Sequence, residues 1–263
     1  MILTNSIHAP LILSFGAALL YSIIAFNGRF FNQKLRLVTW SLAWLLHAIT
    51  IFYPLSSDNI LFGFGPAISC TAWLVLFVYA LESHTLPQLQ SHFRLLLLAA
   101  LAVLLAAFFP GKAVSSPDIF WQPVHWALGI ASYSIFGVAI IHASLAIRAE
   151  KQLRKAMSPQ TGLPLLTLER LTFHLSTLGF ILLSLTLLMA IGLYYTHPRF
   201  DLKLNHKTLF SVLSWLVFAW VLAGRYFLGW RGPKALKLIL LGGLFLFLSY
   251  IGSHFVQEVV LGR

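Results

Sequence analysis

Acidic residues and cysteine are the scarcest chemistry-bearing side chains in this 263-residue chain. Seven Asp and Glu residues stand against 18 Lys and Arg residues. All seven lie at the ends of apolar stretches or in the polar segments between them, which argues against a relay of buried carboxylates for protons or cations. The single cysteine, Cys70, excludes an intrachain disulfide framework and any Cys-pair redox or zinc chemistry. Because it lies inside an apolar stretch, we interpret it as a small buried hydrophobe.

Sequence patterns of common catalytic sites are also missing. The chain has no Ser-His-Asp arrangement, no phosphate-binding glycine loop and no HExxH motif. No residue set supplies a base, a nucleophile or a metal-activated water, so we do not expect an enzyme.

Long apolar runs dominate what is present. The chain is 59% hydrophobic and 10% charged, which makes lipid its expected solvent. Its polar breaks leave eight apolar stretches, each close to the ~20 residues that a helix needs to cross the hydrocarbon. They cover residues 9–26, 37–54, 60–81, 93–110, 120–148, 171–195, 207–228 and 234–257. None alternates as a barrel strand does, so we predict an all-α integral membrane bundle of about eight transmembrane helices, forming one polytopic domain over residues 1–263.

The placement of positive charge predicts an orientation. Thirteen of the 18 Lys and Arg residues lie in the loops after the first, third, fifth and seventh spans, and five lie on the other side. By the positive-inside rule, the larger set is cytoplasmic and both termini face outward. The first span has no basic n-region and no clear cleavage site, so we expect it to be permanent. The basic excess is therefore topological, with anionic membrane lipid as the expected partner and no nucleic acid.

The longest polar segment, residues 148–170, lies on the cytoplasmic side of this arrangement. Its first half has helical charge spacing, and Ser158, Pro159 and Gly162 then interrupt it. We expect a helical extension of the fifth span followed by a turn.

Several histidines fall inside the apolar spans, where a polar ring is costly. The chain has ten in all. At about 1.5 Å rise per residue, His125, His206 and His254 fall at the outer ends of their spans, and His47 falls about 16 Å from Arg36, near the midplane. His142 and His174 fall near the cytoplasmic face as a possible inner pair. The other four, His8, His84, His92 and His197, lie in loops or near the ends.

Haem binding suits this set of histidines. Neutral imidazoles on two helices can supply both axial positions of a haem iron, and the apolar macrocycle suits a bilayer. We therefore predict a haem b site with His125 and His254 as candidate iron ligands and with His206 and His47 as further candidates. For each histidine alone, the competing interpretation is a hydrogen bond to a backbone carbonyl or a place at the membrane interface.

Two stretches resemble a known family. WQPVHWALGIASYSIFGVAIIHASLAI, from Trp121, resembles the helix of CcsA/CcmC-type cytochrome c assembly proteins that opens with an external histidine, here His125. The stretch from His206, which ends FLSYIGSHF, resembles the family's last two helices. The similarity covers roughly residues 120–257, and the eight-span layout is most similar to the HemX/YpjD branch.

The resemblance implies haem handling at the bacterial inner membrane, with external histidines as axial ligands and a tryptophan-rich external loop at the haem edge. The corresponding loop here reads LYYTHPRFDLKLNHKT, which keeps Asp201 and has no tryptophan. The family's second external histidine comes a few residues after His254, so His254 or His206 is the candidate replacement.

Three hypotheses follow. The first is a haem-binding membrane protein related to cytochrome c assembly. The second is a non-catalytic accessory or scaffold subunit that kept the fold and partners another membrane protein. The third, a small-solute transporter, predicts a polar central cavity, and the scarcity of buried charge counts against it.

Overall fold

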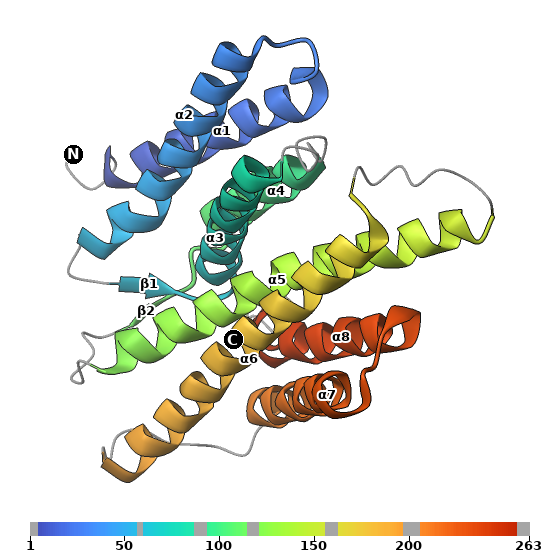
Figure 1. Ribbon diagram of the computed structural model, residues 1–263. Helices are drawn as coiled ribbons and strands as arrows, with labels where there is room; N and C mark the ends of the chain where they lie inside the picture. Colours follow the sequence, from blue (N-terminus) through green and yellow to red (C-terminus); the bar gives the residue numbers. More distant parts are fainter. Residues whose placement is uncertain are drawn as a thin grey trace. The chain divides into compact units, whose positions relative to one another are not determined.

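The fold is an assembly of apolar helices, as the sequence predicts. A computed structural model describes residues 5–56, 60–86, 94–114, 121–155, 163–196 and 206–256 (Figure 1). Its elements in chain order are α1 (Asn5–Asn27), α2 (Gln33–Phe52), the 3-10 turn η1 (Tyr53–Ser56), β1 (Ile60–Phe62), α3 (Phe64–Thr85), α4 (Arg94–Phe108), β2 (Lys112–Val114), α5 (Trp121–Leu153), α6 (Leu165–Thr196), α7 (His206–Leu228), α8 (Gly232–Phe247), the π-helical segment η3 (Leu248–Gly252) and α9 (Ser253–Phe255). The predicted all-α membrane bundle is confirmed.

Seven of the eight predicted spans form helices long and apolar enough to cross a membrane. The exception among the described residues is α4, an apolar helix of 15 residues. At 1.5 Å per residue it is about 22 Å long, shorter than a typical hydrocarbon core. It forms where the sequence predicts the fourth span, at residues 93–110, so that span is present but short.

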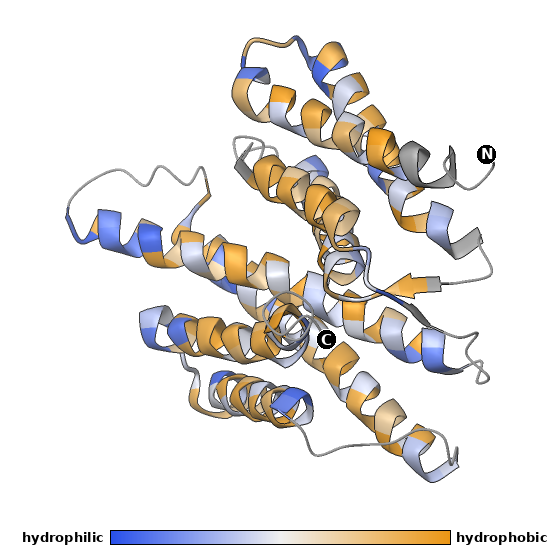
Figure 2. Cartoon of the chain, turned by 180° about the vertical axis from the view of Figure 1, so that it is seen from behind, coloured by the Kyte–Doolittle hydropathy of each residue, from blue (hydrophilic) through white to orange (hydrophobic). Residues whose placement is uncertain are grey.

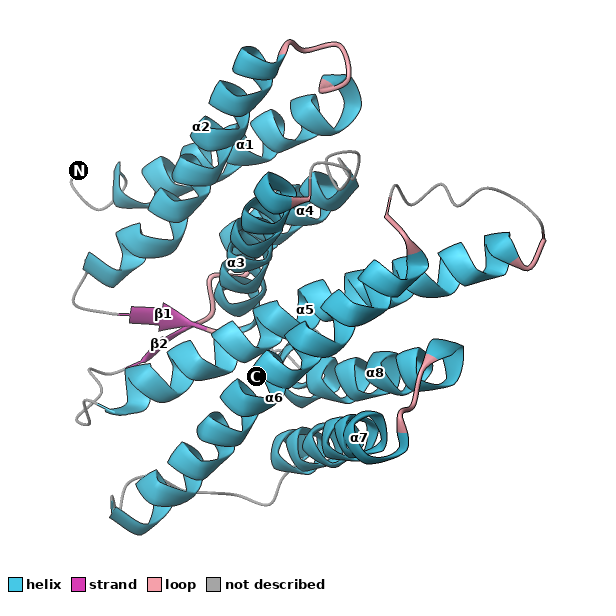
Figure 3. Ribbon diagram, viewed as in Figure 1, coloured by secondary structure: helices cyan, strands magenta, loops and turns pink. Residues whose placement is uncertain are grey.

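The predicted start of the third span was wrong. Residues 60–62, expected to open the third span, form strand β1, which pairs antiparallel with β2 in the register Ile60 with Val114 and Phe62 with Lys112 (Figure 3). Gly111 lies directly before β2 at φ 82°, and a Cβ there would meet the Phe62 carbonyl at 2.5 Å. A residue with a side chain is therefore excluded sterically at Gly111, which lets the two strands approach.

Helix α5 continues past its apolar span. At 33 residues it is about 50 Å long, well beyond a hydrocarbon core of about 30 Å. Its C-terminal end is hydrophilic (Figure 2), and Arg154, directly after it, pairs with Glu150 one turn back at 2.7 Å. The predicted helical extension of the fifth span is confirmed, whereas Ser158, Pro159 and Gly162 lie outside the described residues.

The chain divides into two compact units. The first contains α1, α2, α3 as far as Ala80, α4 and the two strands. Inside it, α1 packs on α2 and α4 through small side chains, with Ala17, Ala43 and Ala99 all buried. Small residues let helices in lipid approach closely, so van der Waals contact holds this unit together. The single domain expected from the sequence stays a prediction.

The second unit contains the last residues of α3, from Leu81, and α5 to α9. Its centre is a stacked pair of buried rings, Phe136 of α5 and Phe218 of α7, with centroids 3.8 Å apart. Gly179 of α6 faces the Phe136 ring and Gly242 of α8 faces the Phe218 ring. Two glycines on opposite helices thus make room for an aromatic pair that joins α5 to α7.

Candidate functional site

Helices α5, α7 and α8 carry the predicted external histidines. His125 lies in the second turn of α5, His206 is the first residue of α7, and His254 follows α8 and its π-helical continuation in α9. His125 and His254 are half-buried, while His206 is exposed. All three belong to the second unit.

A tyrosine sets the register between α5 and α8. The Tyr133 hydroxyl of α5 donates to the Leu246 carbonyl of α8 at 2.7 Å. Further along α5, Ile140 lies against Gly243, so the two helices run antiparallel. His125 lies eight residues before Tyr133 and His254 lies eight residues after Leu246. Each is therefore about 12 Å from the same contact and in the same direction, which brings the two histidines to one end of the unit.

Helix α6 passes the same end. The Ser132 hydroxyl of α5 donates to the Gly179 carbonyl of α6 at 3.2 Å. The His125 ring, seven residues before Ser132, forms a hydrogen bond with the backbone of Thr186, seven residues after Gly179. The matching steps show that α5 and α6 are antiparallel. His125 is thus held from α6 while it remains half-buried.

The start of α7 is tied to the end of α8. The Lys207 ammonium lies 3.0 Å from Nε2 of His254, and the Ser249 hydroxyl donates to the Lys207 carbonyl at 3.1 Å. Ser249 also shares a hydrogen bond with the Ser211 hydroxyl one turn along α7. His206, next to Lys207, therefore lies at the same end as His254.

The π-helical segment Leu248–Gly252 shapes this end of α8. Such segments are rare in helices and frequent at functional sites, because the wider turn redirects the side chains that it carries. Tyr250 in the segment packs against the His254 ring, with centroids 4.3 Å apart, and it forms a T-shaped contact with the Tyr133 ring at 6.5 Å. Aromatic rings thus link the histidine to the α5 register contact.

In the part of the chain that the structure describes, the ligand chemistry of this end is imidazole rather than carboxylate or thiolate. The described residues include no group of three or more His, Cys, Asp or Glu side chains that could hold a bare metal ion. Two neutral imidazoles from separate helices match what a haem iron needs at its axial positions. His254 has such a neutral nitrogen. Its Nε2 accepts a hydrogen bond from the Lys207 ammonium, so this nitrogen carries a lone pair.

His47 lies in the first unit and in a different environment. The side chain is completely buried, with Nε2 at 2.8 Å from the Ser69 hydroxyl and Nδ1 at 3.3 Å from the Tyr21 hydroxyl. In the same unit, the Trp44 and Trp73 rings stack at 4.4 Å. Both ring nitrogens of His47 are therefore engaged within the helix packing.

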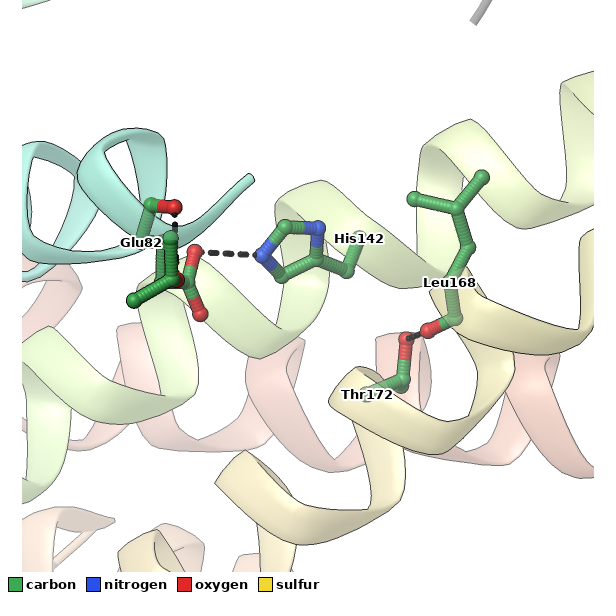
Figure 4. Close-up of polar contacts among 5 residues, drawn as sticks. Glu82, His142, Leu168 and Thr172 are labelled. Atoms are coloured by element: carbon green, nitrogen blue, oxygen red, sulfur yellow. Dashed lines mark hydrogen bonds and ion pairs between the residues drawn. The ribbon is translucent and has the colours of Figure 1, made fainter. Parts of the chain in front are cut away.

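Sequence reasoning missed a polar pair in the second unit. Glu82, at the end of α3, accepts a hydrogen bond from Nε2 of the buried His142 at 2.7 Å (Figure 4). His174 lies on an exposed face of α6, so the expected inner pair of His142 and His174 is not formed. The position of Glu82 at a span end is visible in the sequence, but its inward turn is not.

Some predicted positions lie outside the described residues. They are His92, His197 and Asp201.

The fold and these histidines define a multi-span membrane protein with imidazole side chains gathered at one end of a helix group. The profile of the cytochrome c assembly protein family matches residues 9–261. The chain belongs to that family, which confirms the resemblance found in the sequence.

Several curated proteins are similar to the chain. Inner membrane protein YpjD of Escherichia coli strain K12 is 32% identical over 168 residues, which is 62% of this chain and 62% of YpjD. An Azospirillum brasilense protein, named "Uncharacterized 28.8 kDa protein in nifR3-like 5'region", is 32% identical over 145 residues, 54% of each chain. The chain thus matches less than two thirds of the length of these relatives. No solved structure gives a significant match.

Proposed function

We propose that this protein binds haem b at the outer end of its second unit, in the bacterial inner membrane, with His125 and His254 as axial ligands. The observation that carries the proposal is the register through Tyr133 and Leu246, which brings both histidines to one end of antiparallel helices. Membership of the cytochrome c assembly family and the inner-membrane name of YpjD support the assignment.

The residues at this end suit a haem. His254 is half-buried, and Tyr250 beside it offers a ring against which a macrocycle can pack. His206 is the alternative to His254, because it begins α7 at the same end and is exposed. His47 is not in the proposed ligand set, since both of its nitrogens are engaged by Tyr21 and Ser69.

The proposed role is to bind and present haem rather than to catalyse a reaction. A bound haem supplies an iron that accepts two axial nitrogens and can change redox state. The chain supplies the neutral nitrogens and holds them on separate helices, His125 through Thr186 and His254 through Lys207 and Tyr250.

A visible absorption spectrum tests the proposal. Protein purified in detergent, or reconstituted with hemin, is expected to show a Soret band that shifts or weakens at least several-fold in His125→Ala and His254→Ala. The matched control is His174→Ala, which removes an exposed histidine of α6 twelve residues, about 18 Å, from Thr186. A wild-type protein that stays colourless after hemin reconstitution would refute haem binding, and a band that survives both substitutions would refute the ligand pair.

The lack of tryptophan in residues 193–208 favours a second candidate, a non-catalytic accessory subunit of another membrane complex. It predicts that a partner membrane protein co-purifies with wild type and with a variant lacking His125, His206 and His254 alike. Loss of the partner in that variant would count against it.

A further inference from the structure

We propose that Lys207 is a positioning residue of the haem site, whose ammonium covers the iron-binding nitrogen of His254 in the absence of haem and moves to a haem propionate when haem binds. This inference rests on the proposed function and names a recognition element that neither the family nor the relatives assign.

The contact between Lys207 and His254 has a defined polarity. The ammonium can only donate, so at 3.0 Å Nε2 of His254 must accept. Nε2 therefore carries a lone pair and no proton, and this lone pair is also what an iron would take. Lys207 and the iron compete for one atom.

The backbone of Lys207 is anchored while its side chain can move. The Lys207 carbonyl accepts from the Ser249 hydroxyl at 3.1 Å, and Ser249 is bonded to Ser211 in the next turn of α7. Ser249 lies in the π-helical segment that also carries Tyr250. The ammonium can thus leave His254 without α7 separating from α8, because these two hydrogen bonds between the helices do not involve Nζ.

Haem offers the displaced ammonium a better partner. Each haem carries two propionate carboxylates, which need donors or cations when the macrocycle enters a site of low dielectric. A charge-assisted hydrogen bond to a carboxylate is stronger than one to a neutral imidazole. Five basic residues are predicted on the outer side. Within the described part of the chain, Lys207 is the one that contacts a candidate iron ligand, His254.

The exchange predicts a preference for free propionates. When hemin binds, the contact between Lys207 and His254 is replaced by one between Lys207 and a propionate. Hemin dimethyl ester also displaces the ammonium, but it offers no carboxylate in return. In Lys207→Met both the competition and the carboxylate contact disappear. Hemin should then bind more weakly and the dimethyl ester more tightly, so the two affinities converge.

The experiment titrates full-length detergent-purified protein with hemin and with hemin dimethyl ester and follows the Soret band. We expect wild type to prefer hemin by about tenfold or more, equivalent to one charge-assisted contact. The preference should fall to about twofold or less in Lys207→Met and be partly restored in Lys207→Arg, which keeps a cation. Lys112→Met, which removes another exposed outer basic residue, is the matched control and should keep the wild-type preference.

The outcomes separate the two proposals. An equal preference for hemin in wild type, Lys207→Met and Lys207→Gln overturns the role of Lys207 while leaving haem binding intact. The absence of any Soret band with either porphyrin in wild type overturns the proposed function and this inference with it. A Lys207→Met protein that elutes as aggregate is replaced by Lys207→Gln, for which the same ratio decides.

Discussion

Glu82 and His142, sixty residues apart in the chain, share a hydrogen bond of 2.7 Å between Oε2 and Nε2, with only 13% and 1% of their side chains exposed. Because a carboxylate accepts, Nε2 of the ring donates. Within the described part of the chain no hydrogen-bond partner reaches the other ring nitrogen, Nδ1. The pair fastens the last turn of α3 to α5 inside the second unit.

A double-mutant cycle on this pair should give a measurable coupling. We expect Glu82→Ala to lower the free energy of unfolding by about 1–3 kcal/mol, because it leaves a buried ring N–H without its acceptor. His142→Ala should be costly as well, and the coupling energy should be about 1–2 kcal/mol, as for polar contacts between helices in lipid. Detergent unfolding curves of the two single variants and the double variant measure it.

The control for that cycle is the ion pair of Glu150 and Arg154, one turn apart on the hydrophilic end of α5. Arg154 is 74% exposed, so water screens the pair. Its coupling should stay below about 0.5 kcal/mol. Equal couplings for the two pairs would contradict the argument that burial makes Glu82 and His142 the stronger contact.

The Glu169 carboxylate caps the start of α8. Its Oε1 accepts from the Gly232 backbone N–H at 2.9 Å, across 63 residues of chain. Glu169→Ala should lower the free energy of unfolding by about 1 kcal/mol, as for the loss of a helix cap. Glu169→Gln keeps an acceptor oxygen and should lose less than half of that in the same thermal unfolding assay. If the two substitutions are equally destabilising, the acceptor role is wrong.

Gly65 is required by a close approach of backbones in the first unit. A Cβ at Gly65 would lie 2.8 Å from Cα of Ala106 and 2.9 Å from the Leu105 carbonyl oxygen, both main-chain atoms that cannot swing aside. Gly65→Ala should therefore lower the free energy of unfolding by about 1–3 kcal/mol. Gly192→Ala, in α6 with nothing within 4 Å, is the matched control and should be neutral or slightly stabilising. Thermal unfolding of both variants in one detergent tests the contrast.

His47 should affect stability without affecting haem. His47→Ala removes the contacts to Tyr21 and Ser69 and leaves space in a packed interior, so we expect a loss of about 2–4 kcal/mol in the free energy of unfolding. The Soret band of hemin-reconstituted protein should remain, in contrast to His125→Ala. A His47→Ala protein that folds but loses the band would return His47 to the ligand set.

The sequence alone determined the helical nature and approximate positions of the apolar segments, and it predicted that His125, His206 and His254 share one end. Span length follows from local apolarity and from the fixed rise of a helix, so predicted and observed bounds of α7 differ by a single residue. Depth along each helix follows from the same rise, which is why the positions of His125, His206 and His254 within their spans suffice to group them.

Only the tertiary structure decided which side chains meet. Helices α1 and α3 are apolar around nearly their whole circumference, so their sequences have no amphipathic period that marks the packed face. The sequence therefore could not tell that Glu82 turns toward His142, that Ser69 and Tyr21 engage His47, or that Lys207 covers His254. Those contacts depend on the rotation of each helix about its axis, which packing between helices sets and which local sequence does not encode.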